Sequence, residues 1–167
     1  MDNCIQCTQA ELERVMDIYG KTVYRMAFSQ TRSTADAEDI YQEVFLRYYQ
    51  KRPQFTSEEH RKAWLLRVTI NRARTLFASA WFRKTVPLEE CSICFSQPEE
   101  NRLHEALEKL DKKDRALLHL FYYEELSTKE IANILGRKES TVRTQLTRAR
   151  RKLAEIMKGD AYVSEGI

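Results

Sequence analysis

Hydrophobic residues recur every three or four positions along most of this chain, which is the spacing of amphipathic helices. The first stretch predicts a helix over about 8–30, opened by a capping box of Thr8 and Glu11. Its apolar positions are Leu12, Val15, Met16, Tyr19, Val23, Met26 and Ala27. A second helix is predicted over 35–50, and Pro53 ends it. Its apolar side holds Ile40, Val44, Phe45 and Tyr48.

The next stretch predicts a third helix after a loop at 52–57, with Thr56 and Glu59 as its capping box. One apolar face of this helix holds Ala63, Leu66, Ile70, Ala73 and Phe77. A second apolar face holds Trp64, Leu65, Val68 and Leu76. A helix that is apolar on two sides usually lies between two neighbours. We therefore expect a three-helix bundle over about 8–84.

A segment without helical period follows at 85–98, and its proline and serine content predicts a linker. A second helical domain is expected over 99–158. Its first two helices are predicted at about 99–110 and 112–124, and Asp111 caps the latter. The inward positions of that helix are Leu117, Leu118, Leu120 and Phe121.

The segment from 126 to 153, LSTKEIANILGRKESTVRTQLTRARRKL, has the pattern of a helix-turn-helix. Ser127 with Glu130 is a capping box for its first helix, and Gly136 ends that helix at a tight turn. The last helix is predicted over about 139–157. The positions expected to pack inward are Ile131, Ala132, Leu135, Val142, Leu146 and Leu153.

The outward face of the last helix carries short hydroxyls and arginines, which suit a helix in the major groove of DNA. Arginine can bind guanine through two hydrogen bonds, hydroxyls can reach phosphates or base edges, and threonine methyls can contact thymine. The candidate DNA contacts are Lys138, Ser140, Thr141, Arg143, Thr144, Thr147, Arg148 and Arg151. The alternative interpretation is a plain helical hairpin with a solvated basic face.

The composition is that of a globular, mostly helical protein: the 167 residues are 43% hydrophobic and 32% charged, with four Gly and three Pro. The net charge of +3 conceals separate blocks. Residues 60–84 hold seven Arg or Lys and no acid, whereas 34–45 hold four acids and no base. Residues 85–101 are also acidic and lack a base. Blocks of opposite sign suggest separate partners for separate surfaces.

Three segments resemble the extracytoplasmic-function (ECF) group of RNA polymerase sigma factors. Residues 116–153 resemble region 4, DAEDIYQEVFLRYYQ at 36–50 resembles region 2.2, and HRKAWLLRVTINRARTLF at 60–77 resembles regions 2.3–2.4. Their order also agrees with the family, and the resemblance covers about 8–158. It implies an all-α protein of two small helical domains joined by a linker. These would be a sigma region 2 helical bundle and a sigma region 4 helix-turn-helix.

The sequence departs from the family pattern at three positions, which leaves the promoter sequence open. Lys138 stands at the cap of the recognition helix, where Ser is frequent, and Ser140 stands where Gly is frequent. Thr75 stands where Asp is common in region 2.4.

The resemblance implies that the basic third helix captures the melted minus-ten element of the promoter. The residues that would do so are His60, Arg61, Lys62, Trp64, Arg67, Asn71, Arg72 and Arg74. Asn71 and the loop at 53–60 would lie near an extruded base. Among the charges lie Trp64, Phe77, Trp81 and Phe82. Aromatic rings can stack on unpaired bases, although Trp64 and Phe77 are more often core residues.

The resemblance also implies that the acidic second helix docks the clamp helices of the largest subunit of core RNA polymerase, with the flap region as a second contact. The docking residues would be Asp36, Glu38, Asp39, Gln42, Glu43 and Phe45. A negative surface suits a basic partner, although acids in a first helical turn also favour the helix dipole. The acidic linker either threads toward the RNA exit path or is a soluble tether. An anti-sigma factor is expected, since such factors are commonly held inactive by one.

The sequence thus predicts a sigma factor that binds core polymerase, directs it to minus-thirty-five and minus-ten elements and helps to melt promoter DNA. A stand-alone helix-turn-helix regulator is the alternative, but the first domain resembles a polymerase-docking module. No phosphate loop or catalytic motif appears, so we expect neither an enzyme nor a cofactor. The chain has no membrane-spanning apolar run and no signal-peptide pattern, so we expect a cytoplasmic protein without a membrane partner.

Four cysteines form two pairs, Cys4-x-x-Cys7 and Cys91-x-x-Cys94, and four thiolates are the number in a tetrahedral zinc site. The two pairs are far apart along the chain, and the resemblance supplies no such site. We therefore expect no bound metal and four reduced thiols, and the alternative is a metal-binding or redox-sensing site.

Overall fold

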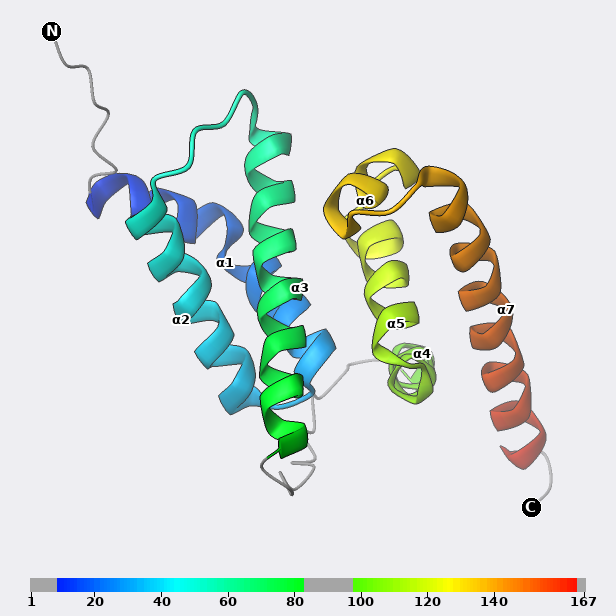
Figure 1. The fold of residues 1–167 in the computed structure, drawn as a ribbon. Coiled ribbons are helices and arrows are strands. Elements are labelled where there is room, and N and C mark those ends of the chain that lie inside the picture. Colours follow the sequence, from blue (N-terminus) through cyan, green and yellow to red (C-terminus); the bar gives the residue numbers. More distant parts are fainter. Residues whose placement is uncertain (1–8, 83–97, 165–167) are drawn as a thin grey trace, which may run out of the picture. The chain divides into compact units, whose positions relative to one another are not determined.

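The computed structural model describes residues 9–82 and 98–164, with side chains at 9–79 and 102–159. Every regular element in these ranges is a helix, which confirms the predicted all-α fold (Figure 1). The helices form two compact units. None of the described helices is long and apolar enough to cross a membrane.

The first unit, which ends at Cys91, is a bundle of α1 (Gln9–Thr31), α2 (Thr34–Lys51) and α3 (Glu58–Phe82). Each of these helices packs against the other two, as expected for a three-helix bundle (Figure 1). The buried core contains Val15, Tyr19, Val23, Ala27, Ala37, Ile40, Val44, Phe45, Tyr48, Leu65 and Ala73. The second apolar face of α3 packs against this core with its larger side chains partly exposed: Trp64, Val68 and Leu76.

Local signals set both ends of α2. The Ser33 hydroxyl accepts a hydrogen bond from the Asp36 amide at 3.3 Å, which caps the start of the helix. Arg52 adopts a left-handed conformation at φ 46° and closes the helix directly before Pro53, which cannot continue it.

The cap of α3 differs from the predicted box of Thr56 and Glu59. The Ser57 hydroxyl accepts a hydrogen bond from the His60 amide at 3.2 Å, so the cap lies one residue later than predicted. The Thr56 hydroxyl instead lies 3.4 Å from Nδ1 of the His60 ring. The box predicted for α1 begins at Thr8, which is outside the described residues.

The second unit packs around its last helix. Its elements are α4 (Pro98–Lys109), α5 (Lys112–Leu118), the π-helical turn η1 (His119–Tyr123), α6 (Thr128–Leu135) and α7 (Glu139–Ser164). Helix α7 contacts α4, α5 and α6. The buried apolar residues of this unit are Ala106, Leu110, Ala116, Leu117, Leu118, Leu120, Ile131, Ala132, Ile134, Val142, Leu146 and Ala149.

The helix predicted over 112–124 is wrong in its last part, where the chain forms the π-helical turn η1. Its cap is confirmed, because the Asp111 carboxylate accepts a hydrogen bond from the Asp114 amide at 2.9 Å. Phe121 lies within this turn and is half-buried, whereas Leu117, Leu118 and Leu120 are buried as predicted. Helix α7 continues past its predicted end, as far as Ser164.

Predicted local signals close the helix-turn-helix. The Ser127 hydroxyl accepts from the Glu130 amide while the Glu130 carboxylate accepts from the Ser127 amide, which confirms the capping box. Gly136 ends α6 at φ 64°, a left-handed conformation that favours glycine. Of the positions predicted to pack inward, Leu135 and Leu153 are half-buried, whereas Ile134, which was not among them, is buried.

Several predictions concern residues outside the described part of the chain. These are the linker before Pro98, the side chains of Trp81 and Phe82, and the cysteines Cys4, Cys7, Cys91 and Cys94. Among the residues that the structure does describe, no three His, Cys, Asp or Glu side chains are grouped so that they could hold a metal ion.

Candidate nucleic-acid and polymerase interfaces

The predicted DNA-reading face consists of exposed side chains on α7 and in the turn before it. All eight predicted contacts are exposed: Lys138, Ser140, Thr141, Arg143, Thr144, Thr147, Arg148 and Arg151. Val142, Leu146 and Ala149 are buried on the opposite side of α7. The structure therefore brings the eight residues together on the outward side of a well-packed helix.

Two threonine hydroxyls on this face are hydrogen-bonded within α7. Thr144 donates to the carbonyl of Ser140 at 3.1 Å, and Thr147 donates to the carbonyl of Arg143 at 3.0 Å. Such bonds restrict the side-chain rotamers. The threonine methyl groups remain for apolar contact with thymine.

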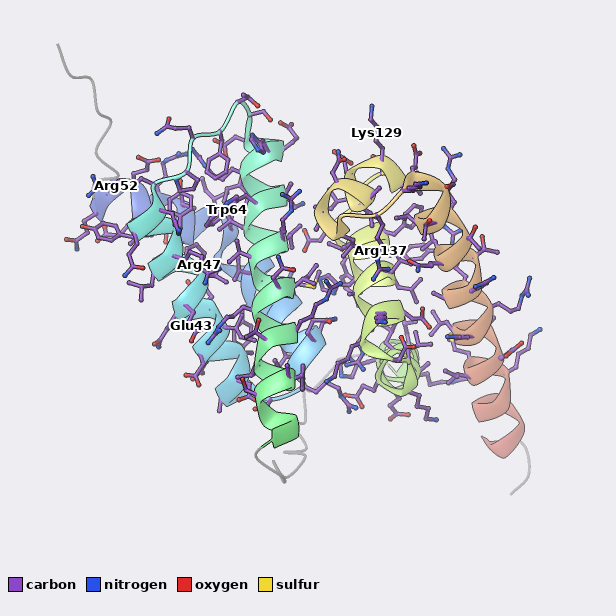
Figure 2. The ribbon with its side chains drawn as sticks, in the orientation of Figure 1. Glu43, Arg47, Arg52, Trp64, Lys129 and Arg137 are labelled. Atoms are coloured by element: carbon purple, nitrogen blue, oxygen red, sulfur yellow. The ribbon has the colours of Figure 1, made fainter. Side chains whose placement is uncertain are left out.

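Two side-chain hydrogen bonds fix α7 relative to the segments before it. The Thr128 hydroxyl, at the start of α6, donates to Oε1 of Glu139, at the start of α7, at 2.9 Å. Arg137 in the turn donates from Nη1 to Oε1 of Gln145 at 2.6 Å. Figure 2 labels Arg137, as well as Lys129, which projects from the tip of α6. The hydrophobic pattern predicts neither bond, because it carries no information on polar partners in different elements.

Two basic residues near the end of the helix-turn-helix are bonded to the fold. Arg150 donates from Nε to the Tyr122 hydroxyl at 2.8 Å, and its guanidinium carbon lies 4.8 Å from the centre of the Phe121 ring. Lys152 pairs with Asp114 at 2.7 Å, and this hydrogen bond raises the pKa of Lys152. Both residues therefore tie α7 to α5 and η1.

The predicted minus-ten contacts divide into exposed and half-buried residues. The exposed ones are His60, Arg67, Asn71 and Arg74. The half-buried ones are Arg61, Lys62, Trp64 and Arg72. Arg61 pairs with Glu58 at 2.7 Å, and Arg72 forms a two-point ion pair with Glu43 of α2. Two predicted minus-ten contacts thus have carboxylate partners within the protein.

An aromatic cluster holds the loop between α2 and α3. Phe55 of the loop stacks on Tyr48 at 6.1 Å between ring centres and meets Trp64 edge-on at 6.0 Å. The His60 ring lies edge-on at 5.3 Å, and the Arg61 guanidinium lies 5.4 Å from the Phe55 ring centre. Trp64 is therefore a partly buried core residue. Sequence reasoning missed Phe55, whose signal is that it is the one aromatic residue in a polar loop.

A polar network joins the start of α3 to α1. The Tyr19 hydroxyl donates to Oε2 of Glu58 at 2.6 Å. Burial and this hydrogen bond raise the pKa of Tyr19 to about 12, and the same bond lowers the pKa of Glu58. Arg61 lies 3.9 Å from the Glu11 carboxylate and so connects it with Glu58. The network holds the start of α3 in a defined position.

The predicted docking surface on α2 is only partly exposed. Glu38, Asp39 and Gln42 are exposed, whereas Asp36 and Glu43 are half-buried. The prediction of Phe45 as a docking residue is corrected, because only 3% of Phe45 is exposed and its ring centre lies 4.8 Å from that of Tyr41. The hydrophobic pattern already places Phe45 on the inner side of α2, and that prediction is the one confirmed. The exposed apolar residues beside it are Leu46 and Tyr49.

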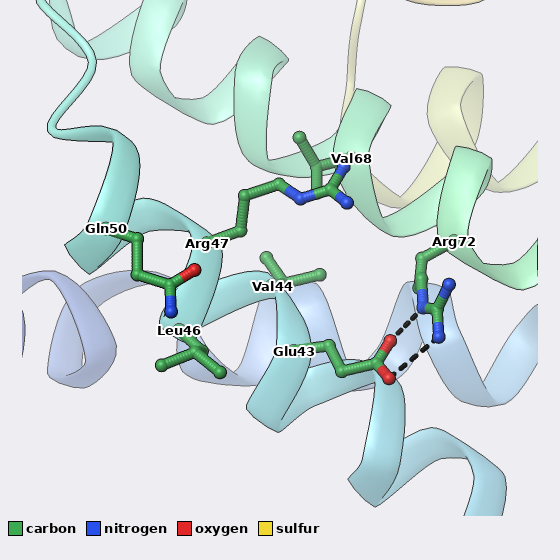
Figure 3. Close-up of a pocket in the computed structure, with 7 residues that line it drawn as sticks. All are labelled: Glu43, Val44, Leu46, Arg47, Gln50, Val68 and Arg72. Atoms are coloured by element: carbon green, nitrogen blue, oxygen red, sulfur yellow. Dashed lines mark hydrogen bonds and ion pairs between the residues drawn. The ribbon is translucent and has the colours of Figure 1, made fainter.

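An open cleft lies between α2 and α3 beside the ion pair (Figure 3). It is lined by Glu43, Val44, Leu46, Arg47, Gln50, Val68 and Arg72. Figure 3 shows Arg47 extending toward Val68, with the pair of Glu43 and Arg72 farther along the cleft. The cleft thus combines apolar and charged groups, and Glu43 is the one residue of its lining that was predicted to dock polymerase.

Each compact unit matches a protein family. The family Sigma-70 region 2 matches residues 15–83, and the family Sigma-70, region 4 matches residues 100–153.

Curated sigma factors match most of the chain. The ECF RNA polymerase sigma factor SigL of Mycobacterium tuberculosis is 32% identical, over 87% of this chain and 88% of SigL. SigW of Bacillus subtilis is 29% identical, over 86% of this chain and 87% of SigW. BldN of Streptomyces coelicolor is also 29% identical, over 89% of this chain but only 61% of BldN.

Two solved structures share the fold. One is the sigma factor RpoE from Bartonella quintana in complex with the anti-sigma factor NepR, with a TM-score of 0.71 and 19% identity over 89% of this chain and 97% of that chain. The other is CnrH in complex with the cytosolic domain of CnrY, with a TM-score of 0.69 and 24% identity over 92% and 91%. The identity to SigL, over nearly its whole length, and the two matched regions identify the family. The chain belongs to the extracytoplasmic-function RNA polymerase sigma factors.

Proposed function

We propose that this chain binds core RNA polymerase and directs it to promoters, where α7 reads the minus-thirty-five element and the α3 region captures the melted minus-ten element. The observation that carries the proposal is the outward face of α7. Its exposed arginines and hydroxyls lie on a helix that buried residues and two hydrogen bonds hold in place. Family membership supplies core polymerase as the partner.

The first unit supports the minus-ten part of the proposal. Arg67, Asn71 and Arg74 are exposed along α3, where they can meet phosphates and an unpaired base. The preceding loop is already ordered by the contacts of Phe55 with its aromatic neighbours. A preformed loop reduces the entropy that is lost when a base is captured.

The exposed surface of α2 supports polymerase docking. Glu38 and Asp39 offer negative charge to a basic partner, and Leu46 and Tyr49 offer apolar area beside it. A polar rim beside apolar anchors is typical of protein interfaces. By family resemblance, the partners are the clamp helices for α2 and the flap region for the second unit.

Three further proposals follow from the family. Residues 8–84 and 99–158 would act as separate binding domains, with the acidic segment 85–98 between them. RpoE was crystallised with the anti-sigma factor NepR, and we propose that a comparable protein restrains this chain. The role needs no catalytic group or cofactor, and because RNA polymerase acts in the cytoplasm, this protein would act there too.

Run-off transcription with purified core polymerase on genomic fragments tests the proposal. We expect specific transcripts only when the chain and core polymerase are both present. The isolated chain should bind promoter DNA weakly and lose that binding as salt rises, since phosphate contacts dominate it. Tight, specific DNA binding by the isolated chain, with no effect on core polymerase, would instead show a stand-alone regulator.

A further inference from the structure

We propose that Glu139 is a positioning residue for promoter recognition, which holds the Arg143 guanidinium for base reading and discourages its binding to phosphates. The inference rests on the proposed role of Arg143 in the minus-thirty-five element. It adds a residue that does not itself touch DNA but decides how selectively its neighbour does.

One carboxylate oxygen connects three residues on two elements of the helix-turn-helix, α6 and α7. Oε1 of Glu139 accepts a hydrogen bond from Nη2 of Arg143, one turn later on α7, at 2.7 Å. The same atom accepts a hydrogen bond from the Thr128 hydroxyl, at the start of α6, at 2.9 Å. The carboxylate is thus fixed from the neighbouring helix, and the arginine is held against that fixed point.

The anchor from α6 distinguishes Glu139 from an ordinary ion pair on a helix surface. An exposed pair four residues apart is weak because both side chains must give up rotamer freedom. Here Thr128 directs the carboxylate, and Thr128 is itself the first residue of a helix capped by Ser127. The Thr128 hydrogen bond and the charge of Arg143 also lower the pKa of Glu139, so its negative charge persists throughout the physiological pH range.

The geometry leaves Arg143 able to read a base. A guanidinium has five N–H donors, and this pair occupies one of them on Nη2. Reading guanine takes two donors aimed at one base edge. Two-thirds of the Arg143 side chain is exposed, at 67%, so the remaining donors face solvent where DNA would lie.

The charge of Glu139 also weakens the binding of Arg143 to DNA phosphates, which competes with base reading. A free arginine pairs with any phosphate, which raises affinity for all DNA without raising selectivity. A fixed carboxylate beside the guanidinium cancels part of that attraction and repels the phosphates themselves. Glu139 should therefore lower the affinity for unspecific DNA more than it lowers the affinity for the cognate element.

The test compares Glu139→Gln with the wild-type chain in complex with core polymerase. The probes are a promoter fragment recovered by run-off transcription and the same fragment with its minus-thirty-five element scrambled. Glutamine can still accept the Thr128 hydrogen bond but removes the charge beside Arg143. We expect the ratio of cognate to scrambled affinity to fall by about threefold or more, mainly through tighter binding to the scrambled fragment.

A double-mutant comparison separates positioning from other roles. In an Arg143→Ala background, Glu139→Gln should leave the ratio unchanged, because the residue that it positions is gone. Thr128→Val should lower the ratio in the wild-type background, because it frees the carboxylate. Glu155→Gln removes the same charge from an exposed site farther along α7 and should leave the ratio unchanged.

Two results would overturn the inference. One is that Glu139→Gln has the same ratio of cognate to scrambled affinity as the wild-type chain. The other is an equal drop with and without Arg143, which would mean that Glu139 contacts a base directly or acts through the fold. If Arg143→Ala also keeps the wild-type ratio of cognate to scrambled affinity, both this inference and the base-reading role of Arg143 are overturned. The run-off transcription assay would still test polymerase-dependent initiation separately.

Discussion

Glu43 of α2 and Arg72 of α3 form a two-point ion pair, and one of its contacts joins Arg72 Nη2 to Glu43 Oε1 at 2.8 Å. The pair joins the helix proposed to dock polymerase to the helix proposed to bind DNA. Each residue was expected on a separate surface with a separate partner. Reversing the charge of Glu43 therefore changes more than the docking surface, because it leaves Arg72 facing a like charge.

Charge reversal at Asp39 gives the cleaner test of docking. Asp39→Lys should weaken the association with core polymerase in a pull-down while changing the free energy of unfolding by less than about 0.5 kcal/mol, since Asp39 is exposed. Glu43→Lys should also weaken docking, but should lower the free energy of unfolding by about 1 kcal/mol, measured by urea denaturation. Undiminished association of Asp39→Lys would count against the α2 docking surface.

Two arginines of α7 should differ in what they contact on DNA: Arg143 should read a base and Arg151 should bind a phosphate. Arg143→Ala should cost about 1–3 kcal/mol on the cognate minus-thirty-five element and relax the preference there, because a base contact is lost. Arg151→Ala should weaken binding to all DNA about equally, as expected for a phosphate contact. Equilibrium binding of the polymerase complex to cognate and scrambled fragments measures both. Equal losses on the two fragments for Arg143→Ala would contradict its assignment.

The turn of the helix-turn-helix should depend on glycine for backbone reasons alone. Gly136 has φ 64°, and a Cβ added there would meet no atom within 4 Å. Gly136→Ala should therefore lower the free energy of unfolding by about 1–2 kcal/mol through left-handed strain without a clash. Gly159→Ala is the matched control, because Gly159 lies within α7 in open space and alanine should stabilise the helix by about 0.5–1 kcal/mol. A neutral Gly136→Ala would mean that the turn relaxes.

The hydrogen bond from Tyr19 to Glu58 should make stability depend on pH at both extremes. The folded-state pKa of Tyr19 is raised from 10.0 to about 12, so the folded protein holds an extra proton in that window. Stability from this bond is complete below pH 10 and is lost as the pH rises toward 12. The pKa of Glu58 is lowered from 4.5, so the contribution is also lost as the pH falls below that value toward the folded-state pKa.

Tyr19→Phe should remove both effects. At neutral pH it should lower the free energy of unfolding by about 1–2 kcal/mol, because a hydrogen bond to a charged carboxylate is lost. The difference between Tyr19→Phe and wild type should then shrink in thermal melts above pH 10. Tyr24→Phe, on the same helix, is the control. A constant difference from pH 7 to pH 11 would rule out the proposed linkage.

Interactions within a few residues determined several helix ends, and these could be predicted. Ser127 and Glu130 cap α6, Asp111 caps α5, and Gly136 ends α6, as the sequence signals indicate. Each of these signals joins a side chain to a backbone group three residues away or sets one φ angle. The outward face of α7 followed from the same local periodicity, because Val142 and Leu146 define its buried side.

Residues distant in sequence decided the rest of the site. Arg72 pairs with Glu43 across 29 positions, and Thr128 meets Glu139 across 11 positions, on separate helices. Phe55 contacts Tyr48 and Trp64 only when α2 and α3 are packed together. A sequence gives the charge and apolar area of each such residue. It does not say which of several chemically similar residues becomes its partner.

By itself, the sequence determined that the regular elements in the described residues are helices, that they form a bundle and a helix-turn-helix, and which side of α7 faces out. Hydrophobic period and local caps act along one helix at a time, so they need no knowledge of its neighbours. The tertiary structure alone decided that Arg72 faces the Glu43 carboxylate and that the Thr128 hydroxyl of α6 holds Glu139 of α7. Those outcomes depend on how close side chains come after packing, because burial and ion pairing are set by distances that only the folded chain defines.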